Sequence, residues 1–163
     1  MSYLVAERIF ELSLSRRNVS KLREAGATEK DAAGYRIIVS MHVAFLISVS
    51  AEASARGGNN GFWSALFILI FVAAQLVRFW SMYSLDRYWT TKILVLPVHQ
   101  KIERGPYRFM SHPNYAAVIA EVAAFPLIFS CYLTAIVFSI LNAVLLSRRI
   151  RIESGFFTKS LPG

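Results

Sequence analysis

The segment 114–147 constrains the fold of this chain most, because Glu121 is its only charged residue. It is too long for a single helix across a bilayer, which needs about 20 apolar residues. Pro126, followed by Ser130 and Cys131, interrupts the segment near its middle, and a proline disfavours a continuous helix. The segment therefore predicts a hairpin of two apolar helices. Because backbone groups inside a bilayer must be hydrogen-bonded internally, we expect an all-α membrane protein.

Two more apolar segments precede this hairpin. Residues 37–51 reach spanning length when they are extended back to Ala32, and residues 62–80 form the clearest span. The turn-rich tract 56–61 separates them. Residues 1–31 mix apolar and charged side chains, which predicts an amphipathic helix at the membrane surface or a very short span. The predicted fold is an all-α integral membrane protein with about four transmembrane helices plus this N-terminal amphipathic or short spanning helix.

Composition and charge agree with a multi-pass membrane protein. The chain is 55% hydrophobic and 17% charged, with a mean hydropathy of +0.45. Its net charge of +8 does not indicate nucleic-acid binding, because the basic residues stand between long apolar runs. They concentrate near the N-terminus, in the connection 84–111 and near the C-terminus, so the positive-inside rule predicts that both termini and the active site are cytoplasmic. Cys131 is the only cysteine, and no metal site is expected.

Glu121 is the residue that packing explains least, since it lies roughly two turns inside an apolar helix. A lone carboxylate in hydrocarbon is costly unless a partner or a polar cavity receives it. Two interpretations are open at this point. Glu121 either lines a site and contacts a cationic or hydrogen-bonding ligand, or it forms a structural ion pair with Arg78 or Arg149.

A group of candidate site residues stands where this apolar helix begins. His112 and Tyr115 flank Pro113, whose fixed φ suits the first position of a helix. The segment Gly105–Arg108 just before them predicts a tight, rigid approach and contributes Tyr107 and Arg108. Backbone groups, an imidazole and two phenols are therefore expected to converge at membrane depth.

A second group of candidates lies at the end of the last predicted helix. Arg149 and Glu153 are separated by four residues, which places them on one helix face where both can reach a shared pocket. Phosphate-loop, nucleotide-binding and Ser-His-Asp signatures are absent from the sequence. We expect one domain over residues 1–163, with its cofactor site mainly in residues 84–163.

These motifs together resemble those of the isoprenylcysteine carboxyl methyltransferase family, and most closely its small bacterial branch. The likeness rests on the run Gly-Pro-Tyr-Arg-Phe-Met-Ser-His-Pro-Asn-Tyr at residues 105–115, on Glu121, and on Arg149 and Glu153 in an Arg-x-x-x-Glu pattern. The strong part of the resemblance covers roughly the second half of the chain. Each piece alone is weak, but the combination is specific.

The resemblance implies a membrane O-methyltransferase that uses S-adenosylmethionine. The residues implied to bind this cofactor are Tyr107, Arg108, His112, Pro113, Tyr115 and Glu121. Those implied to be catalytic are His112, Arg149 and Glu153. Arg149 would orient the acceptor oxygen, Glu153 would support the geometry of the site, and His112 could accept a proton from a hydroxyl acceptor. The chemistry agrees, because a sulfonium cation favours nearby carboxylates and an anionic acceptor favours a fixed arginine.

The partners expected from these features are the lipid bilayer and a lipophilic small-molecule or prenylated substrate, without nucleic acid. For a member of the small bacterial branch, the resemblance favours lipid-like acceptors such as alkyl pyrones or resorcinols over prenylated protein. Two alternatives stay open: a phospholipid N-methyltransferase, which differs in its acceptor, and a non-catalytic small membrane scaffold. Membrane sterol reductases share part of the C-terminal pattern but are much larger. Cofactor binding separates these alternatives.

Overall fold

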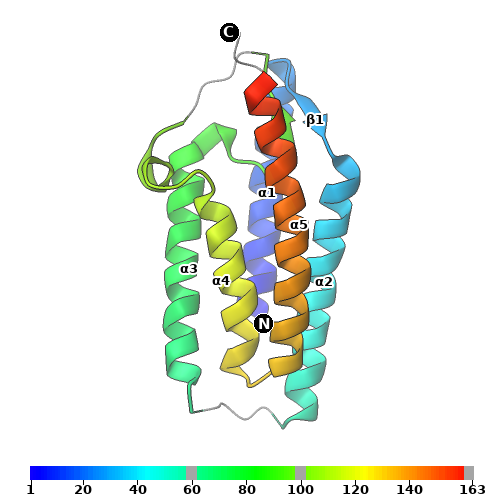
Figure 1. The fold of residues 1–163 in the computed structure, drawn as a ribbon, viewed down its shortest axis with the longest axis vertical. Coiled ribbons are helices and arrows are strands. Elements are labelled where there is room, and N and C mark those ends of the chain that lie inside the picture. Colours follow the sequence, from blue (N-terminus) through cyan, green and yellow to red (C-terminus); the bar gives the residue numbers. More distant parts are fainter. Residues whose placement is uncertain (58–61, 98–101, 160–163) are drawn as a thin grey trace.

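The computed structural model describes residues 1–57, 62–97 and 102–159, so part of the predicted turn tract 56–61 lies outside the described residues. Its elements, in chain order, are α1 (Ser2–Glu24), β1 (Thr28–Lys30), α2 (Ala32–Ala55), α3 (Ser64–Leu85), the 3-10 helix η1 (Asp86–Tyr88), β2 (Ile93–Val95), the 3-10 helix η2 (Gly105–Arg108), α4 (Pro113–Ile128) and α5 (Tyr132–Lys159). The helices run along one common long axis, and the last residues of α5 lie at one end of this bundle (Figure 1).

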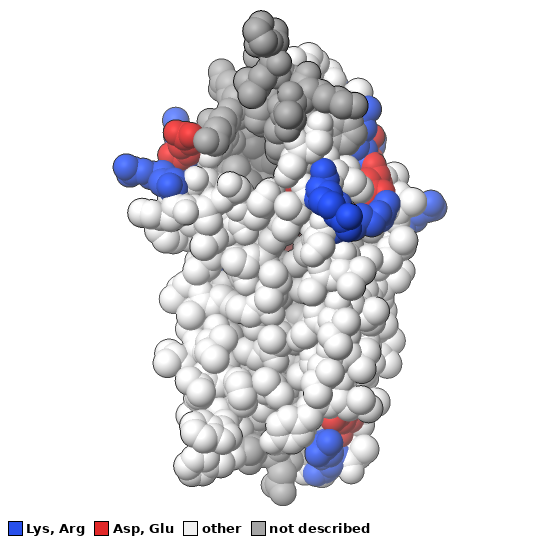
Figure 2. All heavy atoms as spheres, viewed as in Figure 1, with Lys and Arg blue, Asp and Glu red and all other residues white. Residues whose placement is uncertain are grey.

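Three of these helices, α2, α3 and α5, are long and apolar enough to cross a membrane, and α4 is a shorter apolar helix. Helix α4 packs against both α3 and α5, and α2 packs against α5. Figure 2 shows a broad band without charged side chains on one face of the bundle, between charges near its two ends. Such a band matches the apolar core of a bilayer. The prediction of an all-α, multi-pass integral membrane protein is confirmed.

The predicted helical hairpin is also confirmed, with its turn where proline indicated it. Helix α4 ends at Ile128, and the carbonyl of Pro126 accepts hydrogen bonds from the backbone N–H groups of Phe129 and Cys131. Ser130 turns the chain with a positive φ of 56°. These local bonds pair the backbone groups that the end of a helix leaves free inside a membrane protein.

The start of α5 is fixed by a carboxylate from another helix. Glu52, near the end of α2, accepts hydrogen bonds from the backbone N–H of Thr134 at 2.8 Å and of Leu133 at 3.3 Å. A carboxylate at a helix N-terminus pairs the free N–H groups and interacts favourably with the helix dipole. This contact joins α2 and α5 at the end of the bundle where α5 begins.

Apolar residues form the core in the half of the bundle that contains the turn between α4 and α5. Phe45, Val49, Val122, Phe125 and Phe138 are buried in one cluster, in which the rings of Phe45 and Phe138 meet edge to face. The outer faces of the helices are apolar as well, and exposed examples are Leu69, Leu76, Leu133, Ile136, Ile140 and Val144. A surface of this kind is stable in lipid and unsuited to water.

Helix α1 turns a row of polar side chains toward the other helices, whereas the sequence predicted an amphipathic helix at the membrane surface or a very short span. Glu7, Glu11, Ser15 and Asn18 are buried, whereas Ile9 and other apolar residues on the outer side are exposed. The helix begins partway along the bundle and runs toward the end at which α5 ends (Figure 1). Spacings of three and four residues place the buried polar groups in one stripe. This arrangement brings charged groups from the N-terminal helix into the interior of the bundle.

A two-stranded antiparallel sheet ties the α1–α2 connection to the segment after α3. Strand β1 pairs with β2, and Glu29 of β1 lies opposite Leu94. The carboxylate of Glu29 accepts hydrogen bonds from Lys92 at 2.9 Å and from Arg23 at 2.6 Å. The sheet therefore holds the segment that leads into the candidate site.

Candidate active site

A cavity of about 1810 Å³ lies among the helices and extends from β2 and η2 to Leu46 of α2. This volume exceeds the usual 300–1,000 Å³ of a pocket for one small molecule. Val5, Ile9 and Val43 line the cavity, and their exposed fractions of 45%, 61% and 53% place them also at the outer surface. The cavity therefore borders the lipid-facing surface between α1 and α2, and it has room for a cofactor and a lipid-like molecule together.

Four of the predicted site residues form one cluster on the wall of this cavity. The hydroxyl of Tyr115 donates a hydrogen bond to Glu153, and the Arg149 Nε donates to the Tyr115 oxygen at 2.8 Å. The Arg149 Nε lies 3.4 Å from Glu153 Oε1, and His112 Nδ1 lies 3.6 Å from Glu153 Oε2. The rings of His112 and Tyr115 are stacked, with centroids 5.2 Å apart. The structure thus joins α4 and α5 through the residues that the sequence singled out.

The local sequence explains how the α4 side of this cluster is placed. Pro113 occupies the first turn of α4, and His112 stands directly before the helix as its N-cap residue. Upstream, Gly105 has a positive φ of 55°, and a Cβ atom at this position would lie 2.0 Å from Ser84 Oγ and 2.8 Å from Trp80 Nε1. Only glycine fits both the conformation and the space. The close packing of Gly105 against α3 sets the path of the chain into α4.

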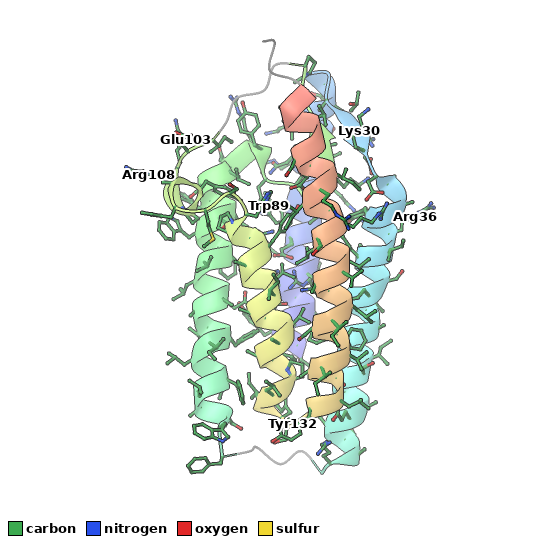
Figure 3. All side chains as sticks on the ribbon, viewed as in Figure 1. Lys30, Arg36, Trp89, Glu103, Arg108 and Tyr132 are labelled. Carbon is green, nitrogen blue, oxygen red and sulfur yellow. The ribbon has the colours of Figure 1, made fainter. Side chains whose placement is uncertain are left out.

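On the α5 side, Arg149 is anchored by the backbone of another segment. Its Nη2 donates a hydrogen bond of 2.8 Å to the carbonyl of Thr91. The preceding residues are fixed in turn, because Asn18 Nδ2 donates to the carbonyl of Trp89 at 2.8 Å. Trp89 is only 2% exposed and lies within the bundle (Figure 3). The guanidinium of Arg149 is therefore held from two sides, through its Nε and its Nη2.

The remaining predicted cofactor residues near η2 differ in their surroundings. Tyr107 lines the cavity, and burial raises the pKa of its phenol to about 12, so the phenol is neutral at physiological pH. Arg108 also lines the cavity and extends outward from η2 at the edge of the bundle (Figure 3). Pro113 is buried but is not among the residues that line the cavity. Its contribution is to the geometry of the helix start.

Glu121 lies apart from the cluster of His112, Tyr115, Arg149 and Glu153. It is 2% exposed and does not line the cavity, and Arg78 Nη2 lies 3.1 Å from its Oε2. Of the two interpretations open from the sequence, the ion pair with Arg78 is present, and Arg149 is not its partner. Arg8 provides a second ion pair to Glu121, which the sequence did not indicate.

Several residues that sequence reasoning missed also line the cavity. The Oδ1 atom of Asn114 is buried without a hydrogen-bond partner among the described residues, directly between His112 and Tyr115 in the chain. Arg8 and His42 line the cavity as well. Asn114 could have been found from the sequence, because it is a polar residue in the first turn of an apolar helix. The hydrogen bond from Arg149 to the Thr91 carbonyl has no signal in the sequence, because every residue carries a backbone carbonyl.

Among the described residues, no group of three or more His, Cys, Asp or Glu side chains is arranged to hold a metal ion. The chemical groups that the cavity offers are therefore a guanidinium, a carboxylate, an imidazole, phenols and an unpaired amide oxygen. These groups can bind a charged organic cofactor and orient an oxygen atom.

Comparisons with known proteins give the following matches. The model of the isoprenylcysteine carboxyl methyltransferase family matches residues 66–158, more than half of the chain. The Bacillus subtilis (strain 168) protein YpbQ, described as uncharacterized, is 40% identical over 153 residues, which cover 94% of this chain and 91% of that protein. An uncharacterized protein of Haemophilus influenzae is 30% identical over 160 residues, covering 98% and 93% of the two chains. No solved structure gives a significant match.

Proposed function

Because the chain belongs to the isoprenylcysteine carboxyl methyltransferase family, we propose that it transfers a methyl group from S-adenosylmethionine to an oxygen of a lipophilic acceptor at the cytoplasmic membrane face. The observation that carries this proposal is the cluster of His112, Tyr115, Arg149 and Glu153 on the wall of a cavity that borders the lipid-facing surface. An enzyme of this class needs one site that meets both a polar cofactor and a lipid-soluble substrate.

The residues present fit the cofactor. It supplies a methyl group activated on a sulfonium, and it also carries amino groups and a carboxylate. The unpaired Oδ1 of Asn114 is a hydrogen-bond acceptor for one of the amino groups. Glu153 offers carboxylate oxygens, and Arg108 at the edge of the cavity is suited to the carboxylate of the cofactor. The stacked rings of His112 and Tyr115 provide a flat aromatic surface for an adenine.

Arg149 is the residue we assign to the acceptor. Its Nε and Nη2 are held by Tyr115 and by the Thr91 carbonyl, so Nη1 can donate a hydrogen bond to an acceptor oxygen without a loss of orientation. Methyl transfer is an in-line displacement in which alignment contributes much of the rate. A carboxylate acceptor is already nucleophilic, whereas a hydroxyl acceptor must lose a proton, which His112 could accept.

The same arginine separates the proposal from the alternatives. A fixed guanidinium attracts an anionic or oxygen acceptor and repels the protonated amine of a phospholipid headgroup, so it disfavours a phospholipid N-methyltransferase. A non-catalytic scaffold would not need the oriented contacts of Tyr115, Arg149 and Glu153. The acceptor class that fits best is a lipophilic small molecule or a prenylated chain with a carboxylate or hydroxyl group.

The test is calorimetric titration of the purified protein in detergent with S-adenosylmethionine. We expect binding by the wild type and about tenfold weaker binding by Asn114→Leu, which removes one hydrogen bond to a charged or polar group. Tyr83→Phe is the control, because Tyr83 is 87% exposed and does not line the cavity. A folded wild type that binds no S-adenosylmethionine would contradict the proposal. Transfer of a labelled methyl group to lipophilic acids and phenols then identifies the acceptor class.

A further inference from the structure

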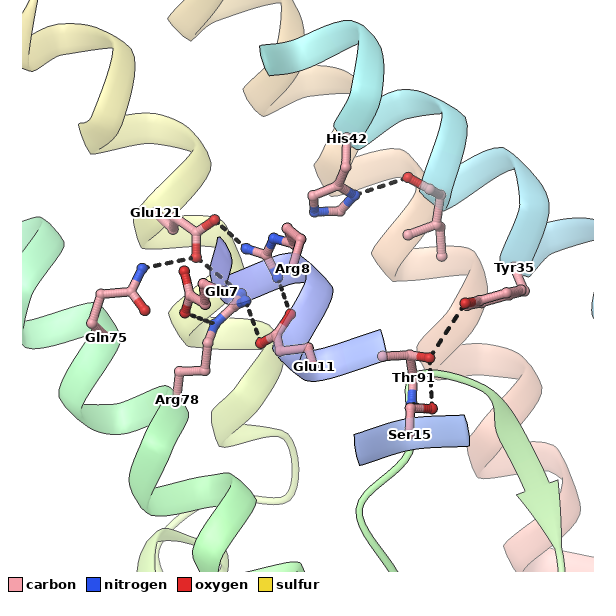
Figure 4. A network of polar contacts seen from close by, with 11 residues as sticks. Glu7, Arg8, Glu11, Ser15, Tyr35, His42, Gln75, Arg78, Thr91 and Glu121 are labelled. Atoms are coloured by element: carbon pink, nitrogen blue, oxygen red, sulfur yellow. Dashed lines mark hydrogen bonds and ion pairs between the residues drawn. The ribbon is translucent and has the colours of Figure 1, made fainter. Parts of the chain in front are cut away.

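Five charged side chains meet deep inside the bundle, apart from the cluster around Tyr115 (Figure 4). We name them the buried charge network, and they are Glu7, Arg8, Glu11, Arg78 and Glu121. The three carboxylates and Arg78 are at most 5% exposed. Charged groups in such surroundings are costly unless they are paired. The pairing inside the network therefore decides which of its groups can remain ionised.

Two arginines face three carboxylates in the network. Arg8 pairs with Glu121 and lies 2.5 Å from Glu11. Arg78 lies 2.8 Å from Glu11 and 3.1 Å from Glu121. Glu7 is left over, since its ion-pair contact is 4.0 Å to Arg78 Nε and neither of its oxygens has a hydrogen-bond partner among the described residues. If all five groups were ionised, the network would carry one excess negative charge.

The groups around Glu7 favour its neutral form. In Figure 4, Glu7 points toward Gln75 and Arg78, and the Gln75 Oε1 is a second buried acceptor without a partner among the described residues. Gln75 uses its Nε2 to donate to Glu121. His42 faces the network from α2, with its Nδ1 2.8 Å from the Ile38 carbonyl. A protonated Glu7 has a donor for the Gln75 oxygen, whereas an ionised Glu7 would place an acceptor against an acceptor.

We propose that Glu7 is a proton-binding site within the membrane-embedded bundle, and that cofactor bound in the cavity promotes release of this proton. The second half of this proposal rests on the proposed function. S-adenosylmethionine has a net charge of +1, because its ammonium and carboxylate cancel and its sulfonium remains. The network is neutral when Glu7 holds a proton and carries −1 when it does not. A cation in the adjoining cavity therefore favours the ionised form of Glu7.

Glu7 would take up a proton again after the reaction. When the new O–CH3 bond forms, the electron pair of the broken C–S bond stays on sulfur, and the cavity then holds a neutral thioether. With the sulfonium charge gone from the cavity, Glu7 rebinds a proton from the solvent. With a hydroxyl acceptor, the proton lost from the acceptor oxygen balances this uptake, so the enzyme and its ligands keep their total charge through the cycle.

The geometry sets the size of this coupling. Glu121 lies eight residues below Pro113 on α4, or roughly 12 Å at a rise of about 1.5 Å per residue, so the network and the cofactor region are separated by about this distance. One unit charge at about 12 Å and an effective dielectric constant of about 20 changes proton affinity about tenfold. Arg8, Glu11 and Arg78 line the cavity, so the network borders it directly. A tenfold fall in proton affinity releases at most about half a proton, at the pH midway between the two titration midpoints.

The first experiment is calorimetric titration of the protein with S-adenosylmethionine at a series of pH values around neutrality, each in two buffers of different protonation enthalpy. We expect the wild type to release, at its maximum, about half a proton per bound cofactor and Glu7→Gln to release almost none while still binding. Glu24→Gln is the matched control, because Glu24 is an exposed carboxylate on the same helix. Equal proton release by the wild type and Glu7→Gln, or binding by the wild type without release, would overturn the inference about cofactor linkage.

A second measurement tests the proton site without the cofactor, so it stays decisive if S-adenosylmethionine does not bind and the proposed function fails. Infrared spectra should contain the carbonyl band of a protonated carboxyl group in the wild type and in Glu24→Gln, and this band should be missing in Glu7→Gln. Thermal unfolding gives an independent check. Glutamine mimics a protonated glutamate, so Glu7→Gln should retain the stability of the wild type, whereas Glu121→Gln breaks ion pairs and should not. Identical infrared spectra, or an equal loss of stability in both variants, would refute a protonated Glu7.

Discussion

Replacement of Arg78 by methionine should destabilise the bundle strongly. The guanidinium of Arg78 is 1% exposed and contacts Glu11 at 2.8 Å and Glu121 at 3.1 Å. Methionine is apolar and fills a similar length, so it leaves these carboxylates with Arg8 as their remaining cation. Loss of one partner from a buried ion pair typically costs about 3–5 kcal/mol, because the other charge is stranded. For a chain of this size, that cost corresponds to a fall in the unfolding temperature of about 10 °C.

The assay is thermal unfolding in detergent, with helicity followed by circular dichroism. Arg36→Met is the control, because Arg36 is an exposed arginine on α2 and its loss should change the unfolding temperature little. The double variant Arg78→Met with Glu121→Gln removes one positive and one negative charge, so it should lose clearly less stability than the sum of the two single changes. If Arg78→Met were no less stable than Arg36→Met, or if the single effects were additive, the ion pairs of Arg78 would not stabilise the bundle.

Three further predictions concern the site and its supports. Arg149→Lys should lower the rate of methyl transfer about 100-fold with little change in cofactor affinity. The reason is that an ammonium cannot replace two oriented contacts worth about 1.5 kcal/mol each. Unchanged turnover would refute the role assigned to Arg149. Gly105→Ala should lower the free energy of unfolding, measured by chemical denaturation, by about 2 kcal/mol or more, because it adds backbone strain and close contacts. Gly57→Ala is the control, since Gly57 has a φ of 70° but open space around it, so only the smaller cost of backbone strain is expected. Hydrogen bonding from Lys92 lowers the pKa of Glu29 in the folded protein. Ionised Glu29 therefore stabilises the fold at pH values above its ordinary pKa of 4.5, and this stabilisation is lost as the pH falls from 4.5 through the folded pKa. Glu29→Gln should flatten this part of the stability–pH curve.

Much of the fold follows from the sequence by itself. The near absence of charge in residues 114–147 and the proline within them suffice for a helical hairpin, because the bilayer excludes unpaired backbone and requires a minimum helix length. Short-range spacing likewise predicts parts of the site. Arg149 and Glu153 lie on one helix face through their separation of four residues, and Pro113 fixes the helix start that positions Tyr115. These features depend on local geometry, which a sequence specifies directly.

The partners of Glu121 could be decided only by the tertiary structure. Arg8, which pairs with it, lies 113 residues away in the chain, on a helix whose charges by themselves suggest a water-exposed face. The same sequence pattern fits a polar face turned toward water and one turned toward other charged helices, and only the packing of α1 against α3 and α4 selects the second. The sequence thus determined that a helical membrane protein would form and that Arg149 and Glu153 would share one helix face, because helix length and spacing are local properties. The tertiary structure decided which charges neutralise one another and left Glu7 without a hydrogen-bond partner among the described residues, because pairing depends on contacts between segments that are distant in the sequence.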